Sequence, residues 1–172
     1  VHPPPGGSPS GAAGTHPAVN VVNPCASGPS ATCGRTALNG NIRLLPSPQI
    51  VVGPDNTLHI VYPRDPDAQN SGDVVDLYYR RSTDSGNTWS AEHRLNDDAT
   101  TSDQFFPSIA IGPTNMVGVG WYDRREDAAN LRINYYATTS FDGGLTWQPN
   151  VKIWDVDSPV VLDAGLATCY HG

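Results

Sequence analysis

Lysine is almost absent from this sequence, and no long apolar run occurs in it. Lys152 is the single lysine beside nine arginines, and the formal net charge is −7. An acidic chain of this kind is not expected to bind nucleic acid, because phosphate binding needs a basic surface. No apolar stretch approaches the roughly 20 residues of a membrane-spanning helix, so no transmembrane segment is expected. The cations that are present are guanidinium groups, which pair with both oxygens of a carboxylate.

Cysteine is also scarce, and its spacing argues against the common metal motifs. The three cysteines are Cys25, Cys33 and Cys169. They lack the compact ligand spacing of a zinc site, and no cofactor is expected. A bridge between Cys25 and Cys33 is one prediction, because it would staple a segment with few core residues. The alternatives are free thiols, or a bridge to Cys169 or to another part of the protein.

A helical hydrophobic period is missing throughout, and the sequence instead contains a repeated phrase. The phrase S-x-D-x-G-x-T-W occurs at residues 82–89 and 140–147, and its aspartates are 142 − 84 = 58 residues apart. This period indicates a repeating structural unit. Asp and Gly favour a tight turn, and a Trp can pack beneath it, so each copy predicts a hairpin connection. The positions given a structural role are Ser82, Asp84, Gly86, Thr88, Trp89, Ser140, Asp142, Gly144, Thr146 and Trp147.

Each unit has the pattern of four short strands bounded by Gly, Pro, Asn or Asp. The first unit is expected to have strands near residues 49–52, 57–62, 74–81 and 92–95. The second unit is expected to have them near residues 108–111, 116–122, 131–139 and 151–154. Four strands per repeat is typical of a β-propeller blade. The predicted fold is therefore all-β, a propeller segment with about two four-stranded antiparallel blades and a repeated turn between strands 3 and 4 of each.

The chain divides into four predicted segments. Residues 1–38 are a Pro/Gly/Ser-rich arm or linker, residues 39–104 and 105–156 are the blades, and residues 157–172 connect to a further blade. A closed propeller takes roughly four to eight blades. Two blades would leave apolar faces and sheet edges open. The remaining blades of the same propeller, or other subunits, are therefore expected as partners.

The repeated phrase resembles the Asp-box, or bacterial neuraminidase repeat, of sialidase-like β-propellers. The resemblance covers roughly residues 39–154. In that family the Asp-boxes lie at the periphery, away from the active site, and they occur in glycosidases, in receptors and in proteins with no assigned activity. The resemblance therefore implies a fold more directly than a function. It also implies an extracellular or cell-surface location and glycan as a candidate ligand.

The same resemblance implies candidate residues for a sialidase site. Those enzymes clamp the substrate carboxylate with arginines, use an Asp as acid/base and use a Tyr nucleophile activated by Glu. The candidate clamp residues here are Arg43 and Arg64. Arg64 is the better candidate, because the run R-L-L-P at residues 43–46 is one residue longer than the family's R-I-P. The candidate acid/base residues are Asp67 and Asp73, in the loop that follows Arg64.

Other features favour a structural interpretation. No Tyr/Glu nucleophile pair can be assigned, because every tyrosine is explicable as a strand or core aromatic. Charged loops recur at residues 65–76 and 121–127, and recurrence favours a role in the blade. The sequence leaves open whether a structural Ca²⁺ binds in the first of these loops. His59 is expected to be structural, and His93 has no visible partner.

Three functional hypotheses follow from these observations. The first, slightly favoured, is a secreted, non-catalytic propeller that binds glycan or protein. The second is a segment of an exo-sialidase or related glycoside hydrolase. The third is a structural subunit whose Pro/Gly-rich N-terminal arm reaches into a neighbour and whose open sheet edges pair between chains.

Overall fold

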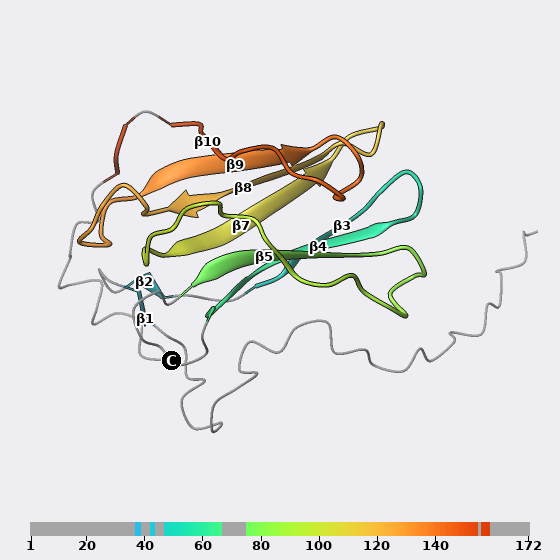
Figure 1. The fold of residues 1–172 in the computed structure, drawn as a ribbon, viewed down its shortest axis with the longest axis horizontal. Helices are drawn as coiled ribbons and strands as arrows, with labels where there is room; N and C mark the ends of the chain where they lie inside the picture. Colours follow the sequence, from blue (N-terminus) through green and yellow to red (C-terminus); the bar gives the residue numbers. More distant parts are fainter. Residues whose placement is uncertain (1–36, 39–41, 44–46, 67–74, 155, 159–172) are drawn as a thin grey trace, which may run out of the picture.

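The structure is a computed structural model that describes residues 37–38, 42–43, 47–66, 75–154 and 156–158. The described residues form ten strands and no helix. Eight of these strands make two four-stranded antiparallel sheets, which lie one above the other, with a two-stranded hairpin beside one end (Figure 1). The predicted all-β fold with two antiparallel blades is confirmed.

The strands of each sheet pair in chain order. The first sheet contains β3 (Gln49–Val52), β4 (Leu58–Arg64), β5 (Asp76–Ser82) and β6 (His93–Arg94). The second contains β7 (Gln104–Ile111), β8 (Val117–Asp123), β9 (Asn134–Ser140) and β10 (Val151–Lys152). The fourth strand of each sheet is shorter than expected. The hairpin of β1 (Ala37–Leu38) and β2 (Ile42–Arg43) was not expected from the sequence.

The first turns of the two sheets have the same geometry. The amide of Gly53 donates to the carbonyl of Thr57 at 2.8 Å, and the amide of Gly112 donates to the carbonyl of Met116 at 2.8 Å. Each turn contains one asparagine with a left-handed backbone conformation. Its φ is 63° at Asn56 and 59° at Asn115. Asparagine tolerates this conformation well, because its short side chain can hydrogen-bond to nearby backbone.

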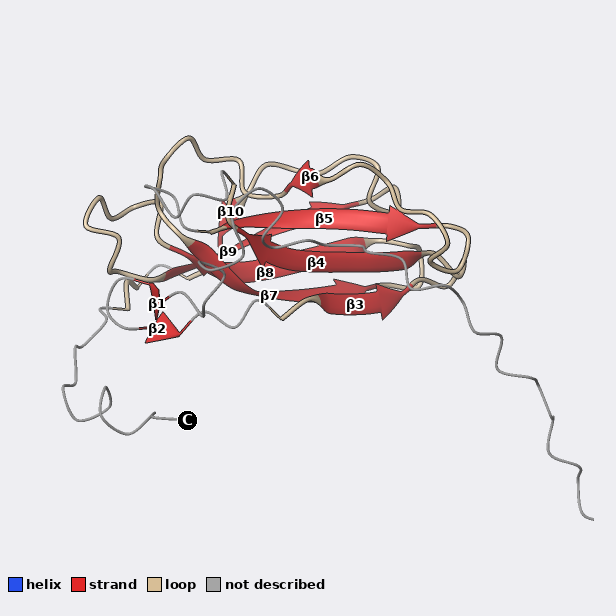
Figure 2. Cartoon of the chain, turned by 90° about the horizontal axis from the view of Figure 1, so that it is seen from below, coloured by secondary structure: helices blue, strands red, loops and turns tan. Residues whose placement is uncertain are grey.

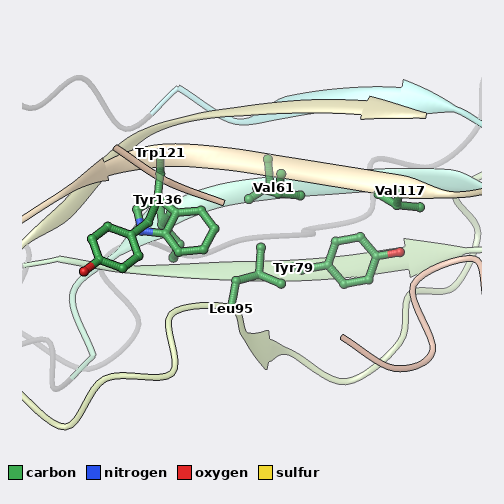
Figure 3. Close-up of a cluster of buried hydrophobic side chains, with 8 residues drawn as sticks. Val61, Tyr79, Leu95, Val117, Trp121 and Tyr136 are labelled. Atoms are coloured by element: carbon green, nitrogen blue, oxygen red, sulfur yellow. The ribbon is translucent and has the colours of Figure 1, made fainter. Parts of the chain in front are cut away.

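The two sheets pack face to face around a shared apolar core (Figure 2). Side chains from both sheets point toward one another in this layer (Figure 3). Alternate residues of a strand share a face, which explains why Val117, Val119 and Trp121 of β8 all point into this layer. The buried members are Val61, Leu77, Tyr79, Leu95, Val117, Val119, Trp121 and Tyr136.

A buried histidine lies in the first sheet beside this core. His59 is 1% exposed, and its Nδ1 lies 2.6 Å from the hydroxyl of Tyr79. Its Nε2 is buried with no hydrogen-bond partner. The ring of His59 therefore belongs to the packed interior of the first sheet, which agrees with the structural role expected for it. His93, for which the sequence shows no partner, stacks its ring on Trp147 with 6.4 Å between centroids.

The stability of the fold is expected to decrease as the pH falls below the ordinary histidine value of 6.5. Burial lowers the pKa of His59, so the unfolded chain takes up the proton before the folded chain does. The loss occurs between pH 6.5 and the lower pKa of the folded state. Urea denaturation of the wild type and of His59→Gln, from neutral into acid pH, should show a flatter pH dependence for the variant. Equal slopes would contradict this assignment.

Candidate functional site

The topology separates the strand connections into two groups at opposite ends of the sheets. In a meander the first and third connections lie at one end, and the second and outgoing connections lie at the other. We call the first the turn end; it carries residues 53–57, 83–89, 112–116 and 141–147, after which residues 90–92 and 148–150 run back along the sheets. We call the second the loop end; it carries residues 65–75, 95–103 and 124–133. Both repeated turns therefore lie at the opposite end of the sheets from the charged loops.

The candidate catalytic and clamp residues from the sequence belong to the loop end. Arg64 is the last residue of β4, and Asp67 and Asp73 lie in the loop that follows it but outside the described residues. Arg43 lies in β2, opposite Ala37, shortly before the loop end of β3. The strand order thus places Arg64 at the loop end of the first sheet. Cys25, Cys33 and Cys169 also lie outside the described residues.

Both repeated turns are closed by their aspartate. In the first, Oδ1 of Asp84 accepts from the Ser82 hydroxyl at 2.7 Å and from the Thr88 amide at 2.9 Å. Its Oδ2 accepts from the Thr88 hydroxyl at 2.6 Å. Asp142 makes the same bonds to Ser140 and Thr146 at the same distances. One carboxylate therefore satisfies several donors of a turn that has few apolar contacts of its own.

Glycine and tryptophan complete these turns in different ways. Gly86 and Gly144 have φ of 87° and 81°, which a residue with a Cβ adopts only with strain. Trp89 donates through Nε1 to the carbonyl of Gly86 at 3.1 Å and packs against apolar residues of its own sheet. Trp147 instead packs edge-on against Tyr79 of the first sheet, with 4.8 Å between centroids. The second turn therefore belongs to the junction between the sheets.

The carboxyl group of Asp84 is expected to titrate near pH 2, below its ordinary value of 3.8. Hydrogen bonds from the hydroxyl and amide of Thr88 favour the charged form and lower the pKa to about 2. Removing the hydroxyl with Thr88→Val should raise this pKa, as measured by the pH dependence of the carboxyl ¹³C chemical shift. The stability that Asp84 contributes is lost as pH falls from 3.8 toward 2. A titration unchanged in the variant would contradict the assigned cause.

Arg64 lies in a compact polar group that we call the Arg64 cluster: Tyr62, Arg64, Tyr78 and Glu92. Its Nη2 is 3.3 Å from Oε2 of Glu92, and its Nη1 donates to the carbonyl of Asp65 at 2.9 Å. The guanidinium carbon lies 4.1 Å from the centre of the Tyr78 ring. The Arg64 side chain is 18% exposed. Both terminal nitrogens of this guanidinium and one face of its plane thus contact groups of the first sheet and its connections.

The Arg64 cluster contains a tyrosine–glutamate pair that sequence reasoning missed. The hydroxyl of Tyr62 donates to Oε1 of Glu92 at 2.7 Å. The two residues are 30 positions apart, and nothing in the local sequence of either indicates the contact. Burial, and then the hydrogen bond to Glu92, raises the pKa of Tyr62. The phenol is therefore held in its protonated form, which donates a hydrogen bond and is a poor nucleophile.

The second charged loop forms the polar part of the junction between the sheets. Arg125 reaches Asp97 at 2.7 Å and Asp123 at 2.8 Å, and its Nη2 donates to Oδ1 of Asn150 at 2.9 Å. Its guanidinium carbon lies 4.3 Å from the ring centre of Tyr136. We call these five residues the junction network. The network joins the connection after β6 to the loop after β8. The second charged loop therefore contributes to packing between the two sheets.

A second buried network fixes the start of β5 at the loop end. Asp76 is 1% exposed and accepts from Nδ2 of Asn96 at 2.6 Å and from Nη1 of Arg94 at 3.1 Å. Burial raises the pKa of Asp76, while these hydrogen bonds act in the opposite direction. Asn96 also donates to Gln104 at 2.9 Å, which joins the first sheet to the first strand of the second.

The described residues contain neither a membrane-spanning helix nor a cluster of metal ligands. In that part of the chain no helix is long and apolar enough to cross a membrane. The same residues contain no group of three or more His, Cys, Asp or Glu side chains arranged to hold a metal ion.

The paired meanders, with a turn of the same geometry in each, have the architecture of adjacent blades in a sialidase-like β-propeller. Comparison with solved structures agrees with this fold. A Hadza microbial sialidase matches with a TM-score of 0.50 and 19% identity, over 62% of this chain and 25% of the sialidase. This chain therefore spans about a quarter of that protein's length. At this identity the likeness concerns the fold alone.

Two arabinan-degrading enzymes also match at lower scores. The Penicillium chrysogenum α-L-arabinanase has a TM-score of 0.45 and 20% identity, over 60% of this chain and 30% of that one. The endo-arabinase from Bacteroides thetaiotaomicron has a TM-score of 0.40 and 12% identity, over 66% and 46%. No protein-family profile and no curated protein matches the sequence.

Proposed function

We propose that this chain supplies two adjacent blades of a larger extracellular propeller that binds a glycan at its loop end without cleaving it. Residues 39–104 and 105–156 are the blades, residues 1–38 are an arm, and residues 157–172 lead to a further blade. The observation that carries the non-catalytic assignment is the internal engagement of Arg64 by Glu92, Asp65 and Tyr78.

A carboxylate clamp needs a guanidinium with its donors directed at empty space. In this chain Nη2 of Arg64 already faces Glu92 at 3.3 Å, and Nη1 is bonded to backbone at 2.9 Å. A substrate carboxylate would have to displace Glu92 and then lie beside its negative charge. Carboxylates placed close together repel each other, which weakens binding of an anionic sugar at this position. Neutral sugars do not meet this repulsion.

The state of Tyr62 supports the same conclusion. A tyrosine nucleophile must give up its proton, and burial of Tyr62 with Glu92 raises its pKa. The loop end offers instead many hydrogen-bonding groups, including the carboxylates of Asp97 and Asp127. Such a polar surface can bind sugar hydroxyls by direct or water-mediated hydrogen bonds.

The second candidate function is part of an exo-sialidase or related glycoside hydrolase. The observation in its favour is the 2.7 Å pair of Tyr62 and Glu92 beside Arg64, at the end of the strand that leads to Asp67 and Asp73. These are the residue types that such enzymes use. In this candidate Asp67 or Asp73 supplies the acid/base, and the Tyr62 proton passes to Glu92 during attack.

Binding and turnover by the native protein distinguish the two candidates. Retention on immobilised glycans, with no fluorophore released from a fluorogenic sialoside, supports the binding function. Turnover that is lost in Arg64→Ala and Asp73→Asn supports the hydrolase and overturns our proposal. Arg132→Ala is the matched control, because that arginine is 64% exposed and its nearest carboxylate is at 3.6 Å. A protein that neither binds nor cleaves any glycan also overturns it.

A further inference from the structure

One large apolar residue of the second sheet has a left-handed backbone conformation. Phe106, near the start of β7, has a φ of 50°. The other described residues that combine a positive φ with a side chain are Asn56, Ser85, Asn115 and Asn130. Short polar side chains tolerate this conformation by hydrogen-bonding to nearby backbone, whereas a phenyl ring makes no such bond. Phe106 is therefore strained, and strain of this kind persists only where the surrounding structure imposes it.

A β-bulge accompanies this conformation and changes the direction of the Phe106 side chain. Two residues of β7, Phe106 and Pro107, stand opposite one residue of β8, Trp121, where the register of these strands shifts. Regular alternation from Gln104, which is fully buried, would place Phe106 on the buried face of the sheet. Instead Pro107 is buried, and Phe106 is 39% exposed. The bulge thus turns an aromatic side chain out of the core, and bulges that redirect a side chain are common beside functional sites.

Two neighbouring aromatic rings hold the ring of Phe106 in place. Nearly perpendicular contacts join it to Phe105, with 5.2 Å between centroids, and to Tyr122, with 6.4 Å between centroids. Phe105 is itself buried, in the cluster that includes Leu38 and Val75. A ring that is already fixed loses little conformational freedom when a ligand stacks on it, and this favours binding.

The repeat indicates that a further blade would leave Phe106 exposed. The first strands of the two repeats are related by 107 − 48 = 59 positions, so the equivalent of Phe106 is Ser47. Ser47 is exposed, although the second blade packs beside the first. Tyr122 differs, because its equivalent in the first blade, Pro63, is buried. We therefore expect a complete propeller to cover the ring of Tyr122 and to keep that of Phe106 accessible.

The surface that remains accessible has the size of one ring and belongs to the second repeat alone. The repeated turns use the same residue types in both blades, whereas the position of Phe106 is a serine in the first blade. The aromatic ring is thus not needed to build a blade. A stable protein interface buries about 800 Å² on each partner, far more than one phenyl ring offers. The apolar face of a single sugar ring is of matching size.

We propose that Phe106 is a stacking platform on which the C–H face of a neutral hexopyranose lies. The inference rests on the glycan-binding function proposed above and names its contact residue and its class of sugar. Phe106 is the third residue of β7, which begins at the loop end, so the ring lies near the end of the sheets where that function places the glycan. The face of a phenyl ring carries partial negative charge, which attracts the partially positive C–H hydrogens of a sugar.

Binding of the native protein to immobilised neutral glycans that end in galactose, glucose or mannose tests the proposal. The wild type is expected to bind, and Phe106→Ala should lose about tenfold in affinity, because the stacking contact is removed. Phe106→Tyr should bind like the wild type, since it keeps the ring. Phe141→Ala is the matched control: Phe141 is 66% exposed in the second repeated turn, at the opposite end of the sheets, and its loss should leave the affinity unchanged.

Phe106→Asn separates loss of the ring from loss of the fold. Asparagine tolerates a left-handed backbone better than alanine, so Phe106→Asn should unfold at a higher urea concentration than Phe106→Ala. Both variants lack the ring, and both should lose affinity by the same factor. If affinity instead followed stability, so that Phe106→Asn bound like the wild type, Phe106 would have a structural role only and the proposal would be overturned.

The remaining outcomes distinguish this proposal from the function on which it rests. A wild type that binds neutral glycans, with Phe106→Ala binding equally well, overturns the role of Phe106 and leaves the glycan-binding function in place. A wild type that binds only acidic sugars or furanose sugars overturns the class of sugar proposed here. A wild type that binds no glycan overturns both proposals.

Discussion

Replacing Trp121 with alanine is expected to lower the free energy of unfolding by about 4 kcal/mol, the range typical of large aromatic side chains removed from a core. Trp121 is fully buried between the sheets, in the cluster that includes Val61 and Leu77. Its indole Nε1 also donates to Oδ2 of Asp123 at 2.8 Å. The substitution removes apolar packing from both blades and a donor from a buried carboxylate. Urea denaturation followed by tryptophan fluorescence and circular dichroism measures the loss.

Two further variants separate these contributions. Trp121→Phe keeps most of the ring but leaves Asp123 without the indole donor, which should cost about 1 to 2 kcal/mol. Trp154→Ala is the matched control, because that side chain is 59% exposed and its loss should change stability by about 0.5 kcal/mol or less. If Trp121→Ala and Trp154→Ala were equally stable, the two sheets would not share the core described above.

The second large effect is expected for Arg125→Ala, at about 3 kcal/mol of stability. Arg125 is 12% exposed and contacts Asp97, Asp98 and Asp123, of which Asp123 is completely buried. Removing the cation leaves buried negative charge without its partner, and this costs more than loss of an exposed ion pair. The effect should persist at high salt, because buried charges are screened poorly.

Two control variants accompany the Arg125 prediction. Arg125→Lys keeps the charge but loses the planar fork that bonds several oxygens at once, so an intermediate loss is expected. Arg132→Ala, at a side chain 64% exposed, should change stability by about 0.5 kcal/mol or less. A loss at Arg125 that disappears in high salt would show that the junction network is a surface feature, contrary to the burial seen here.

The fold could be predicted because its signals are local and occur twice. Asp84 and Asp142 each organise a turn through residues within four positions, and period-two patterns mark the strands on either side. The hairpin of β1 and β2 was missed because each strand has two residues, too few for a pattern to emerge. The lengths of β6 and β10 were overestimated because the apolar residues beyond them, Leu95 and Ile153, each donate only one further backbone hydrogen bond, to the carbonyls of Leu77 and Tyr135 at 2.8 Å.

Of the candidate site, the sequence could predict the position of Arg64 at one end of the sheet but not the side chains that contact it. The alternation of strand directions places Arg64 at the loop end whatever its contacts are. Its engagement by Glu92, 28 residues away, depends on how β4 and β6 approach across β5. The same limit applies to Arg125 and Asp97, which are also 28 residues apart and belong to different units of the repeat. Sequence patterns identify such residues as charged loop positions and do not identify their partners.

The hydrogen bonds between Asp97 and Asn150 have a consequence for how the chain folds. The amide of Asp97 donates to Oδ1 of Asn150, and the amide of Asn150 donates to Oδ2 of Asp97, each at 2.9 Å and across 53 residues. The last connection of the first blade is therefore completed by the last turn of the second. Contacts over such distances in sequence form late, and they make separate regions fold together. The unit that is repeated in this sequence is consequently smaller than the unit that these hydrogen bonds hold together, and the connection after β6 lacks its partner until the second repeat has been synthesised.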